Sequence, residues 1–263
     1  MSSTETSTVA ALLESVAGGS VEIVDLTQPL TETTPVIKLP PPFANTPGLS
    51  RTEISRYDER GPAWAWYTLT IGEHVGTHLD APIHWVTGKD GADVGSITAN
   101  QLIGPACVID KTAETESDNG YLLTVADLEA WVAENGRVPD GAWVLFRTGW
   151  GSRANDEAAF LNAGEGGPVT PGPDVEASRW LAGERSILGF GVETVGIDAG
   201  AAGGFDPPFP LHNFLLGSGK LGLTQLASLD RLPITGALLV VAPLRLVGGT
   251  GSPSRVFAFV PRA

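Results

Sequence analysis

Three of the four histidines of this chain lie within eleven residues of one another, around a single aspartate. The stretch 72–85 reads G-E-H-V-G-T-H-L-D-A-P-I-H-W and contains His74, His78, Asp80 and His84. The spacings of four, two and four residues are all even, so in an extended chain the four side chains point to the same side. On a helix, Asp80 would leave the face that His74 and His78 share, and the glycine and proline in the stretch disfavour a regular helix. We therefore predict an extended segment that presents three imidazoles and a carboxylate to one side.

This set of side chains is typical of a site for a divalent metal ion with open coordination positions. If His74, His78 and Asp80 hold the ion, positions remain for water and substrate. A divalent cation lowers the pKa of bound water and polarises a carbonyl oxygen, which suits the hydrolysis of an amide or ester. His84 is not needed for a three-ligand site, and the ordinary pKa of histidine, about 6.5, suits it to moving protons. The alternative, a histidine-rich surface loop, explains the clustering poorly.

The fourth histidine, His212, lies far along the chain in P-P-F-P-L-H-N-F-L-L. Two interpretations stay open on the sequence. His212 is either a semi-buried histidine packed beside Phe209 and Phe214, or an active-site residue that the fold brings to the metal region.

Aromatic residues flank the histidine stretch, with Trp64 and Trp66 before it and Trp85 after it. They suggest an apolar pocket for a planar substrate, although ordinary core or interface packing is an equally good explanation of each residue alone. Phe43 lies in the proline-rich segment 31–50. A long apolar segment of this kind is a lid, a dimer arm or a packed surface loop. We include Phe43 with the three tryptophans among the predicted substrate contacts.

Composition limits the class of protein. With 263 residues, 42% of them hydrophobic and 17% charged, the chain can bury a sizeable core. A formal net charge of −14 makes nucleic acid or an anionic membrane surface an unsuitable partner. The single cysteine, Cys107, excludes an internal disulfide and favours a reducing compartment. The chain has no signal-peptide pattern and no apolar run of about 20 residues, so we expect a cytoplasmic protein.

Short strands outnumber helices in the hydrophobic pattern, and they do not alternate regularly with helices. We expect strands at 21–26, 64–71, 106–110, 143–148, 186–191, 194–198, 236–241 and 256–260, and helices at 8–16, 124–135, 155–161 and 174–183. This pattern favours a mixed α/β fold with helices around a central β core. We expect one domain over 1–263.

The segment H-V-G-T-H-L-D-A-P-I-H matches the signature H-x-G-T-H-x-D-x-P-x-H at all seven of its fixed positions. That signature belongs to the metal-dependent cyclase family, which includes bacterial kynurenine formamidases and isatin hydrolases. Further segments resemble the isatin hydrolase branch, namely W-A-W, H-W-V-T-G-K-D, D-E-A-A-F-L-N-A, T-P-G-P, G-I-D-A-G, P-P-F-P-L-H-N and G-T-G-S-P-S-R.

The resemblance implies the family's swivelling β/β/α fold, usually in a homodimer or higher homo-oligomer, with the N-terminal arm, here 1–50, reaching across to the partner. It implies hydrolysis of a small aromatic cyclic amide, most simply isatin to isatinate. An N-formyl aryl amide such as N-formylkynurenine, or a lactone, is an alternative substrate for the same chemistry. A non-catalytic metal-binding protein is a third interpretation, against which the presence of His84 argues. The resemblance to the family assigns His74, His78 and Asp80 as metal ligands, His84 as the proton shuttle and His212 as the distal active-site histidine.

One departure from the family pattern concerns the metal count. Many members carry a metal-binding glutamate shortly after the distal histidine, whereas G-L-T-Q-L-A-S-L-D has Gln225 in that place. A neutral amide cannot supply the charge that a carboxylate brings to a second cation, so we expect one divalent metal ion. Isatin hydrolases, which this arrangement resembles, use manganese, so Mn²⁺ is favoured, and Zn²⁺ is the alternative because it suits histidine ligands equally.

Overall fold

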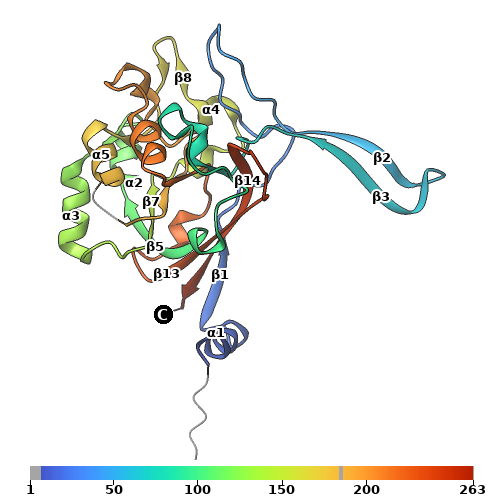
Figure 1. Ribbon diagram of the computed structural model, residues 1–263, viewed down its shortest axis with the longest axis horizontal. Helices are drawn as coiled ribbons and strands as arrows, with labels where there is room; N and C mark the ends of the chain where they lie inside the picture. The colour runs from blue at the N-terminus through green and yellow to red at the C-terminus, as the bar shows by residue number, and fades with distance from the viewer. Residues whose placement is uncertain (1–6, 184–185, 263) are drawn as a thin grey trace, which may run out of the picture.

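The computed structural model describes residues 7–183 and 186–262. It has a body built on β-strands, with helices packed on its outside and a long two-stranded hairpin that projects from it (Figure 1). α1 (Thr8–Ala17) lies beside the first strand of the body. No helix within the described ranges has both the length and the apolar character needed to cross a membrane.

The largest sheet within the described residues has eight strands. Their order is β1 (Val21–Asp25), β14 (Gly251–Pro261), β13 (Ala237–Pro243), β5 (Ile103–Asp110), β7 (Trp143–Arg147), β11 (Gly189–Val192), β12 (Leu221–Thr224) and β4 (His78–Asp80). β14 also pairs with β4, so the sheet closes on itself into a barrel, with β1 attached to β14. The strands β5, β7, β11 and β12 are mutually parallel, whereas β4, β13 and β14 pair antiparallel.

Alternate residues of the central strands enter two separate hydrophobic clusters. On β5, Ala106 and Val108 belong to one cluster, and Cys107 and Ile109 belong to the other. Because successive strand residues face opposite sides of a sheet, one cluster fills the barrel and the other packs under the outer helices. A strand buried on both faces appears in the sequence as a continuous apolar run, which made β5 and β7 recognisable. The strands predicted at 106–110 and 143–148 are confirmed.

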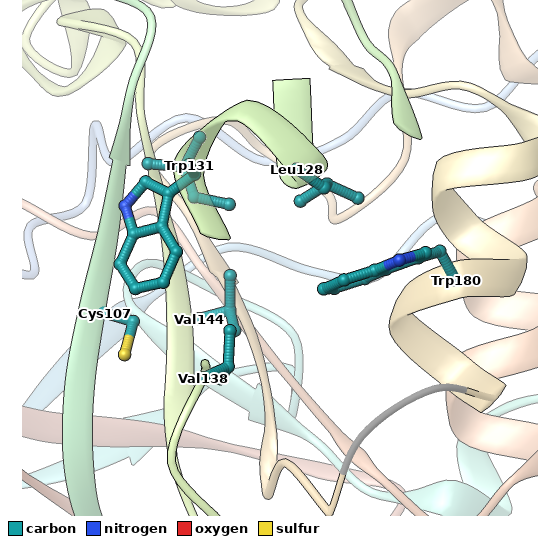
Figure 2. Close-up of a pocket in the computed structure, with 7 residues that line it drawn as sticks. Cys107, Leu128, Trp131, Val138, Val144 and Trp180 are labelled. Atoms are coloured by element: carbon teal, nitrogen blue, oxygen red, sulfur yellow. The ribbon is translucent and has the colours of Figure 1, made fainter. Parts of the chain in front are cut away.

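Two helices cover the outer cluster, α3 (Val125–Asn135) and α5 (Val175–Gly183). Figure 2 shows Trp131 from α3 beside Cys107 and Trp180 from α5 on the opposite side of the pocket, with Val138 and Val144 between them in this view. The Trp131 Nε1–H donates to the backbone oxygen of Val108 at 2.8 Å, so the indole is anchored while its rings stay apolar. Burial raises the pKa of the Cys107 thiol to about 11, as expected for a small hydrophobic residue.

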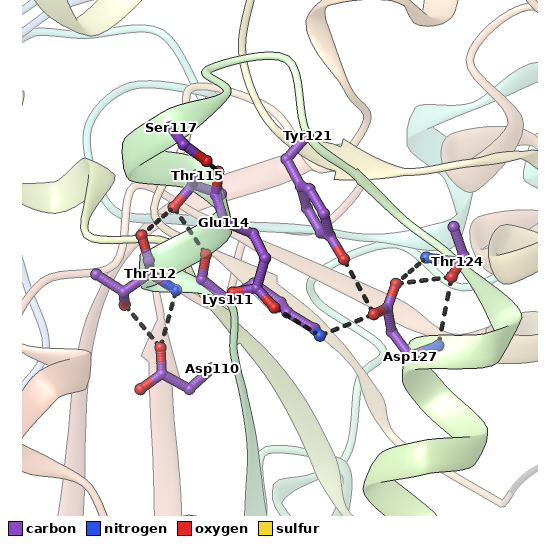
Figure 3. Close-up of polar contacts among 9 residues, drawn as sticks. All are labelled: Asp110, Lys111, Thr112, Glu114, Thr115, Ser117, Tyr121, Thr124 and Asp127. Atoms are coloured by element: carbon purple, nitrogen blue, oxygen red, sulfur yellow. Dashed lines mark hydrogen bonds and ion pairs between the residues drawn. The ribbon is translucent and has the colours of Figure 1, made fainter.

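A polar cluster at the end of β5 fastens α3 to the sheet (Figure 3). The Lys111 Nζ lies 2.8 Å from Oδ1 of Asp127 and 3.0 Å from Oε1 of Glu114. Asp127 also accepts from the hydroxyl of Tyr121 at 3.0 Å, and its other oxygen closes a capping box with Thr124. This capping box fixes the start of α3, which confirms the helix predicted at 124–135.

The projecting hairpin consists of β2 (Ser50–Asp58) and β3 (Gly61–Thr70) (Figure 1). Trp66 on β3 exposes 53% of its surface. Part of the expected N-terminal arm 1–50 lies on the body, because β1 within it pairs with β14 in the main sheet. That the segment reaches across to a partner subunit stays a prediction. The hairpin projects from the body, whereas β1 stays on it because its backbone pairs with β14 along its whole length.

The remaining elements are short. They are the helices α2 (Thr112–Ser117) and α4 (Glu157–Leu161), the strands β6 (Leu122–Leu123), β8 (Ala163–Gly164), β9 (Gly167–Pro168) and β10 (Gly172–Pro173), the 3-10 helices η1 (Pro82–His84), η2 (Val86–Gly88), η3 (Ala99–Gln101), η4 (Trp150–Arg153), η5 (Gly200–Gly204) and η7 (Leu229–Arg231), and the π-helix η6 (His212–Leu216). The strand expected at 194–198 is a run of bends. The whole is the mixed α/β fold with a central β core that the sequence predicts.

Candidate active site

The histidine stretch is extended only over β4, which holds His78 and Asp80. Before β4, Gly76 has φ +65°, a left-handed conformation that favours glycine, and His74 lies in a bend. After β4, Pro82 starts the 3-10 helix η1 that ends at His84. The prediction of one continuous extended segment is therefore wrong outside β4, because these local backbone preferences interrupt it.

The bends nevertheless bring the side chains together. The rings of His74 and His84 are stacked, with centroids 4.0 Å apart and planes inclined by 30°. Nδ1 of His74 lies 2.7 Å from Oδ1 of Asp80, and Nε2 of His78 lies 3.4 Å from the same oxygen. One ligand atom from each of these three residues lies within 4.8 Å of the others.

These three residues fit a divalent metal ion. Asp80 is 2% exposed, and burial alone would raise its pKa, but His78 and His74 lower it well below the usual range. A buried carboxylate that keeps its charge needs a cationic partner, and two imidazole nitrogens converge on the same oxygen. Nitrogen and carboxylate-oxygen donors in this number suit Mn²⁺ or Zn²⁺ and leave coordination positions open.

The π-helix η6 brings His212 to the cluster from the other end of the chain. Its ring centroid lies 5.7 Å from that of His84 and 4.7 Å from that of Trp85. Nδ1 of His212 lies 2.5 Å from Oδ2 of Asp198. Burial alone would lower the pKa of His212, but the hydrogen bond and charge of Asp198, with the charge of Asp80, raise it. Of the two interpretations that the sequence left open, the one that brings His212 to the metal region fits this geometry.

Several residues around the histidines received no role from the sequence. Asp198 follows an apolar run in G-I-D-A-G, and that position after a strand-like segment was its signal. The hydroxyl of Thr224, on the neighbouring strand β12, lies 2.9 Å from Nδ1 and 3.1 Å from Nε2 of His78. Thr250 Oγ1 lies 2.9 Å from Nε2 of His74 and is in turn bonded to Glu73. Nothing in the spacing of these residues indicates such contacts, because strand pairing creates them.

The aromatic residues predicted to contact substrate lie in different places. Trp85 packs against Phe209, with centroids 5.7 Å apart, and against His212. Trp64 and Trp66 contact each other, with ring centroids 6.2 Å apart, and both belong to β3. Phe43 is 64% exposed in the proline-rich segment. Within one chain, therefore, Trp85 joins the histidines, and Trp64, Trp66 and Phe43 face solvent.

Gln225 follows the histidine-contacting Thr224 and is 1% exposed. Its Nε2 donates to the backbone oxygen of Pro35 at 3.4 Å, and its Oε1 has no hydrogen-bond partner in the described part of the chain. Its backbone has φ +53°, which is uncommon for a residue with a side chain. Its effect on the metal count stays a prediction.

Comparison with known proteins agrees with this geometry. A family model described as "Putative cyclase" matches residues 24–199. An isatin hydrolase of Roseibium aggregatum is 49% identical over 248 residues, which cover 93% of this chain and 94% of that protein. A kynurenine formamidase of Salinibacter ruber is 28% identical over 189 residues, covering 72% of this chain and 76% of that protein.

The similarity extends to three-dimensional structure. The crystal structure of an isatin hydrolase bound to the product analogue thioisatinate matches with a TM-score of 0.95 and 47% sequence identity, and the match covers 100% of both chains. The swivelling β/β/α fold expected from the signature is thereby confirmed. From the family model, the sequence identity and the shared fold, the chain belongs to the cyclase family.

Proposed function

We propose that this chain is a metal-dependent hydrolase that opens the five-membered ring of isatin, a cyclic amide, to give isatinate. One observation carries the proposal. The possible metal-binding group His74, His78 and Asp80 lies beside two further imidazoles, those of His84 and His212. The similarity to an isatin hydrolase over nearly the whole chain supports the choice of substrate.

His74, His78 and Asp80 would hold one divalent ion, Mn²⁺ in the first place and Zn²⁺ as the alternative. When bound, the ion lowers the pKa of a coordinated water and polarises the carbonyl oxygen of the amide. The neutral side chain of Gln225 supports a single ion, because it adds no charge for a second one.

The protein's own residues move the proton that the reaction requires. Ring opening forms a bond from the water oxygen to the amide carbon and breaks the bond from that carbon to the ring nitrogen. One proton must pass from the water to the departing nitrogen. Burial lowers the pKa of His84 to about 4, against the opposing influence of Asp80, so its imidazole is neutral and can accept this proton. His84 then returns the proton to the nitrogen.

His212 assists from the opposite side of the cluster. Its Nδ1 is bonded to Asp198, so Nε2 is the nitrogen left to meet the substrate or its leaving group. The elevated pKa of His212 supports a role as a hydrogen-bond donor to the oxygen or nitrogen that becomes negative.

We further propose a homodimer in which the aromatic residues of one subunit complete the site of the other. Trp85 contacts the substrate from its own chain, whereas Trp64, Trp66 and Phe43 reach the site of the partner. Their exposure on the projecting hairpin and the proline-rich segment supports this, because solvent is a poor environment for them. The buried free thiol of Cys107 is compatible with a reducing, cytoplasmic location.

The second candidate function is hydrolysis of an N-formyl aryl amide, favoured by the similarity to a kynurenine formamidase. The two are distinguished by comparing rates on isatin, N-formylkynurenine and a dienelactone, with the metal content measured on the same sample. We expect isatin to be hydrolysed fastest by Mn²⁺-loaded protein. Unchanged isatin with both Mn²⁺ and Zn²⁺ would overturn the substrate assignment, and faster turnover of N-formylkynurenine would favour the second candidate.

A further inference from the structure

A chain of hydrogen bonds joins Glu73, Thr250 and His74 at the edge of the ligand cluster. Oε2 of Glu73 accepts from the backbone N–H of Thr250 at 3.0 Å and from the Thr250 hydroxyl at 2.6 Å. The same hydroxyl oxygen lies 2.9 Å from Nε2 of His74. Neither Glu73 nor Thr250 has a part in the function proposed above, although Thr250 lies in the segment G-T-G-S-P-S-R.

The chemistry of these groups fixes the direction of the bonds. A threonine hydroxyl has one hydrogen to donate, and an ionised carboxylate can only accept. Thr250 therefore donates to Glu73, and its oxygen accepts from His74. Nε2 of His74 must then carry a hydrogen, and Nδ1 is the nitrogen directed at Oδ1 of Asp80, 2.7 Å away. In the neutral ring Nδ1 then has the lone pair, and a lone pair 2.7 Å from a carboxylate oxygen is favourable only when a cation lies between the two atoms.

His78 is arranged in the complementary way. Its Nδ1 lies 2.7 Å from the backbone oxygen of Gly76 and can donate to it, which leaves Nε2 for the cluster. Metal-binding histidines usually donate their second ring N–H to an outer partner that fixes the ring and its tautomer. A backbone carbonyl serves His78 in this way, and the Thr250 hydroxyl, backed by Glu73, occupies the same place for His74.

Strand pairing holds Thr250 rigidly in position. The backbone oxygen of Thr250 accepts from the N–H of Ala81, and the next residue, Gly251, pairs with Asp80 in the β14–β4 ladder. A Cβ atom on Gly251 would lie 2.4 Å from Cε1 of His74 and 2.8 Å from Nδ1. The imidazole of His74 therefore lies directly against the backbone beside Thr250, and the same ladder positions Asp80.

We propose that Thr250 and Glu73 are positioning residues that fix the tautomer of His74 and hold its Nδ1 toward the divalent cation. The proposal rests on the proposed function in one respect, because it takes His74 as a metal ligand. It adds that the geometry of the site depends on a hydroxyl and a carboxylate that are not themselves among the proposed metal ligands.

The test compares Thr250→Val, which replaces the hydroxyl by a methyl group of similar size, with Thr250→Ser, which keeps the hydroxyl. The full-length protein is titrated with Zn²⁺ and with Mn²⁺ against a chromogenic chelator. We expect Thr250→Val to weaken metal binding about 10- to 100-fold and Thr250→Ser to stay within about threefold of the natural protein. Glu73→Gln keeps an acceptor without the charge, so it should weaken binding less than Thr250→Val.

Thr112→Val is the matched control. Thr112 also donates its backbone N–H and its hydroxyl to one carboxylate, that of Asp110, in the polar cluster of Figure 3. The metal affinity of Thr112→Val should equal that of the natural protein. The melting temperatures of all the metal-free variants show whether any of them has lost its fold.

The outcomes separate this proposal from the proposed function. Metal binding in Thr250→Val equal to that of the natural protein would overturn the positioning role while leaving the metal site intact. Equal weakening in Thr250→Val and Thr250→Ser would also overturn it, because packing and not the hydroxyl would then be responsible. If the natural protein binds neither Zn²⁺ nor Mn²⁺ more tightly than Asp80→Ala, the metal site itself fails. If Thr250→Val does not fold, the metal affinity of Glu73→Gln is the deciding measurement. An affinity equal to that of the natural protein would then overturn the proposal.

Discussion

The carboxylate of Asp198 accepts the ring N–H of His212 at 2.5 Å and the backbone N–H of the same residue at 3.1 Å. It also accepts the backbone N–H of Leu211 at 2.7 Å. One side chain therefore fixes both the start of η6 and the rotation of the imidazole. With Nδ1 held in this way, the ring can present only Nε2 to the cluster of histidines.

Replacing Asp198 by asparagine should separate the positioning of His212 from folding. The amide has one acceptor oxygen for three donors and can turn its NH₂ toward Nδ1, which favours the wrong tautomer. We expect kcat to fall about 100-fold with a smaller change in KM, and metal content to stay unchanged. Asp174→Asn is the control, because Asp174 likewise accepts a backbone N–H, that of Ala177, at the start of α5. An unchanged kcat in Asp198→Asn would exclude the positioning role.

His84 and Asp80 should respond differently to truncation. Asp80→Ala removes one of the three proposed metal ligands, so both bound metal and turnover should be lost. His84→Ala should retain metal and lose kcat by about 100- to 10,000-fold, because it removes the proton carrier. Metal analysis of the purified variants, followed by steady-state kinetics, checks both. His84→Gln controls for the lost packing against His74, and full activity in it would contradict proton transfer by His84.

The imidazole of His74 lies against Gly251 and leaves no room for a side chain at this position. A Cβ there would also meet the backbone oxygen of Leu79 at 2.8 Å, and backbone cannot move as a flexible side chain can. Gly251→Ala should therefore weaken metal binding and lower the free energy of unfolding by about 1–3 kcal/mol. Gly166→Ala is the control, since a Cβ there meets nothing within 4 Å. Urea unfolding of both variants checks the difference, and equal stability would show that the contact relaxes freely.

Asp127 should make the free energy of unfolding depend on pH in the acid range. Burial alone would raise the pKa of Asp127, but the hydrogen bonds from Lys111 and Thr124 lower it to about 2. Because its folded pKa lies below the unfolded value of about 3.9, its contribution is complete above that value and disappears as pH falls through about 2. The side chain is 15% exposed, and the shift corresponds to about 2 kcal/mol.

The measurement is the difference in free energy of unfolding between the natural protein and Asp127→Asn. We expect this difference to be constant from pH 6 to 8 and to shrink as the pH is lowered from about 4 to 2. Other carboxylates titrate in the same range, but they do so in both proteins and cancel. A difference that does not change with pH would mean that the charge of Asp127 is unimportant.

The hairpin gives a prediction about assembly. Replacing both Trp64 and Trp66 by serine removes exposed apolar surface from β3 without touching the histidines of the same chain. We expect a dimer in the natural protein and a monomer in the double variant by light scattering, with a raised KM for isatin. Replacement of the exposed Val247, outside the hairpin, should change neither property. A double variant that stays dimeric with unchanged KM would contradict a role for the two tryptophans in the partner's site.

The sequence by itself determined the features that depend on neighbouring residues. The residue types and spacing of His74, His78 and Asp80 indicated a candidate ligand set, and the helix predicted at 124–135 is α3. Continuous apolar runs located β5 and β7 within a few residues. The hairpin strand β2 was missed, because S-R-T-E-I-S-R-Y-D is polar and its partner strand decides its conformation. The start of β14 was missed for the same reason. The strand begins five residues before the apolar run at 256–260, where pairing with another strand and not the residue pattern decides the conformation.

Only the tertiary structure decided how the site is completed. Even spacing suggested one extended surface, but Gly76 and Pro82 bend the chain, and the bends let His84 stack on His74. The contact between His74 and Thr250 joins residues 176 positions apart. Such a contact depends on the register between β4 and β14, which the pairing of whole strands sets. The three proposed metal ligands are thus close together in the sequence, whereas closure of the sheet brings in the groups that we propose orient them.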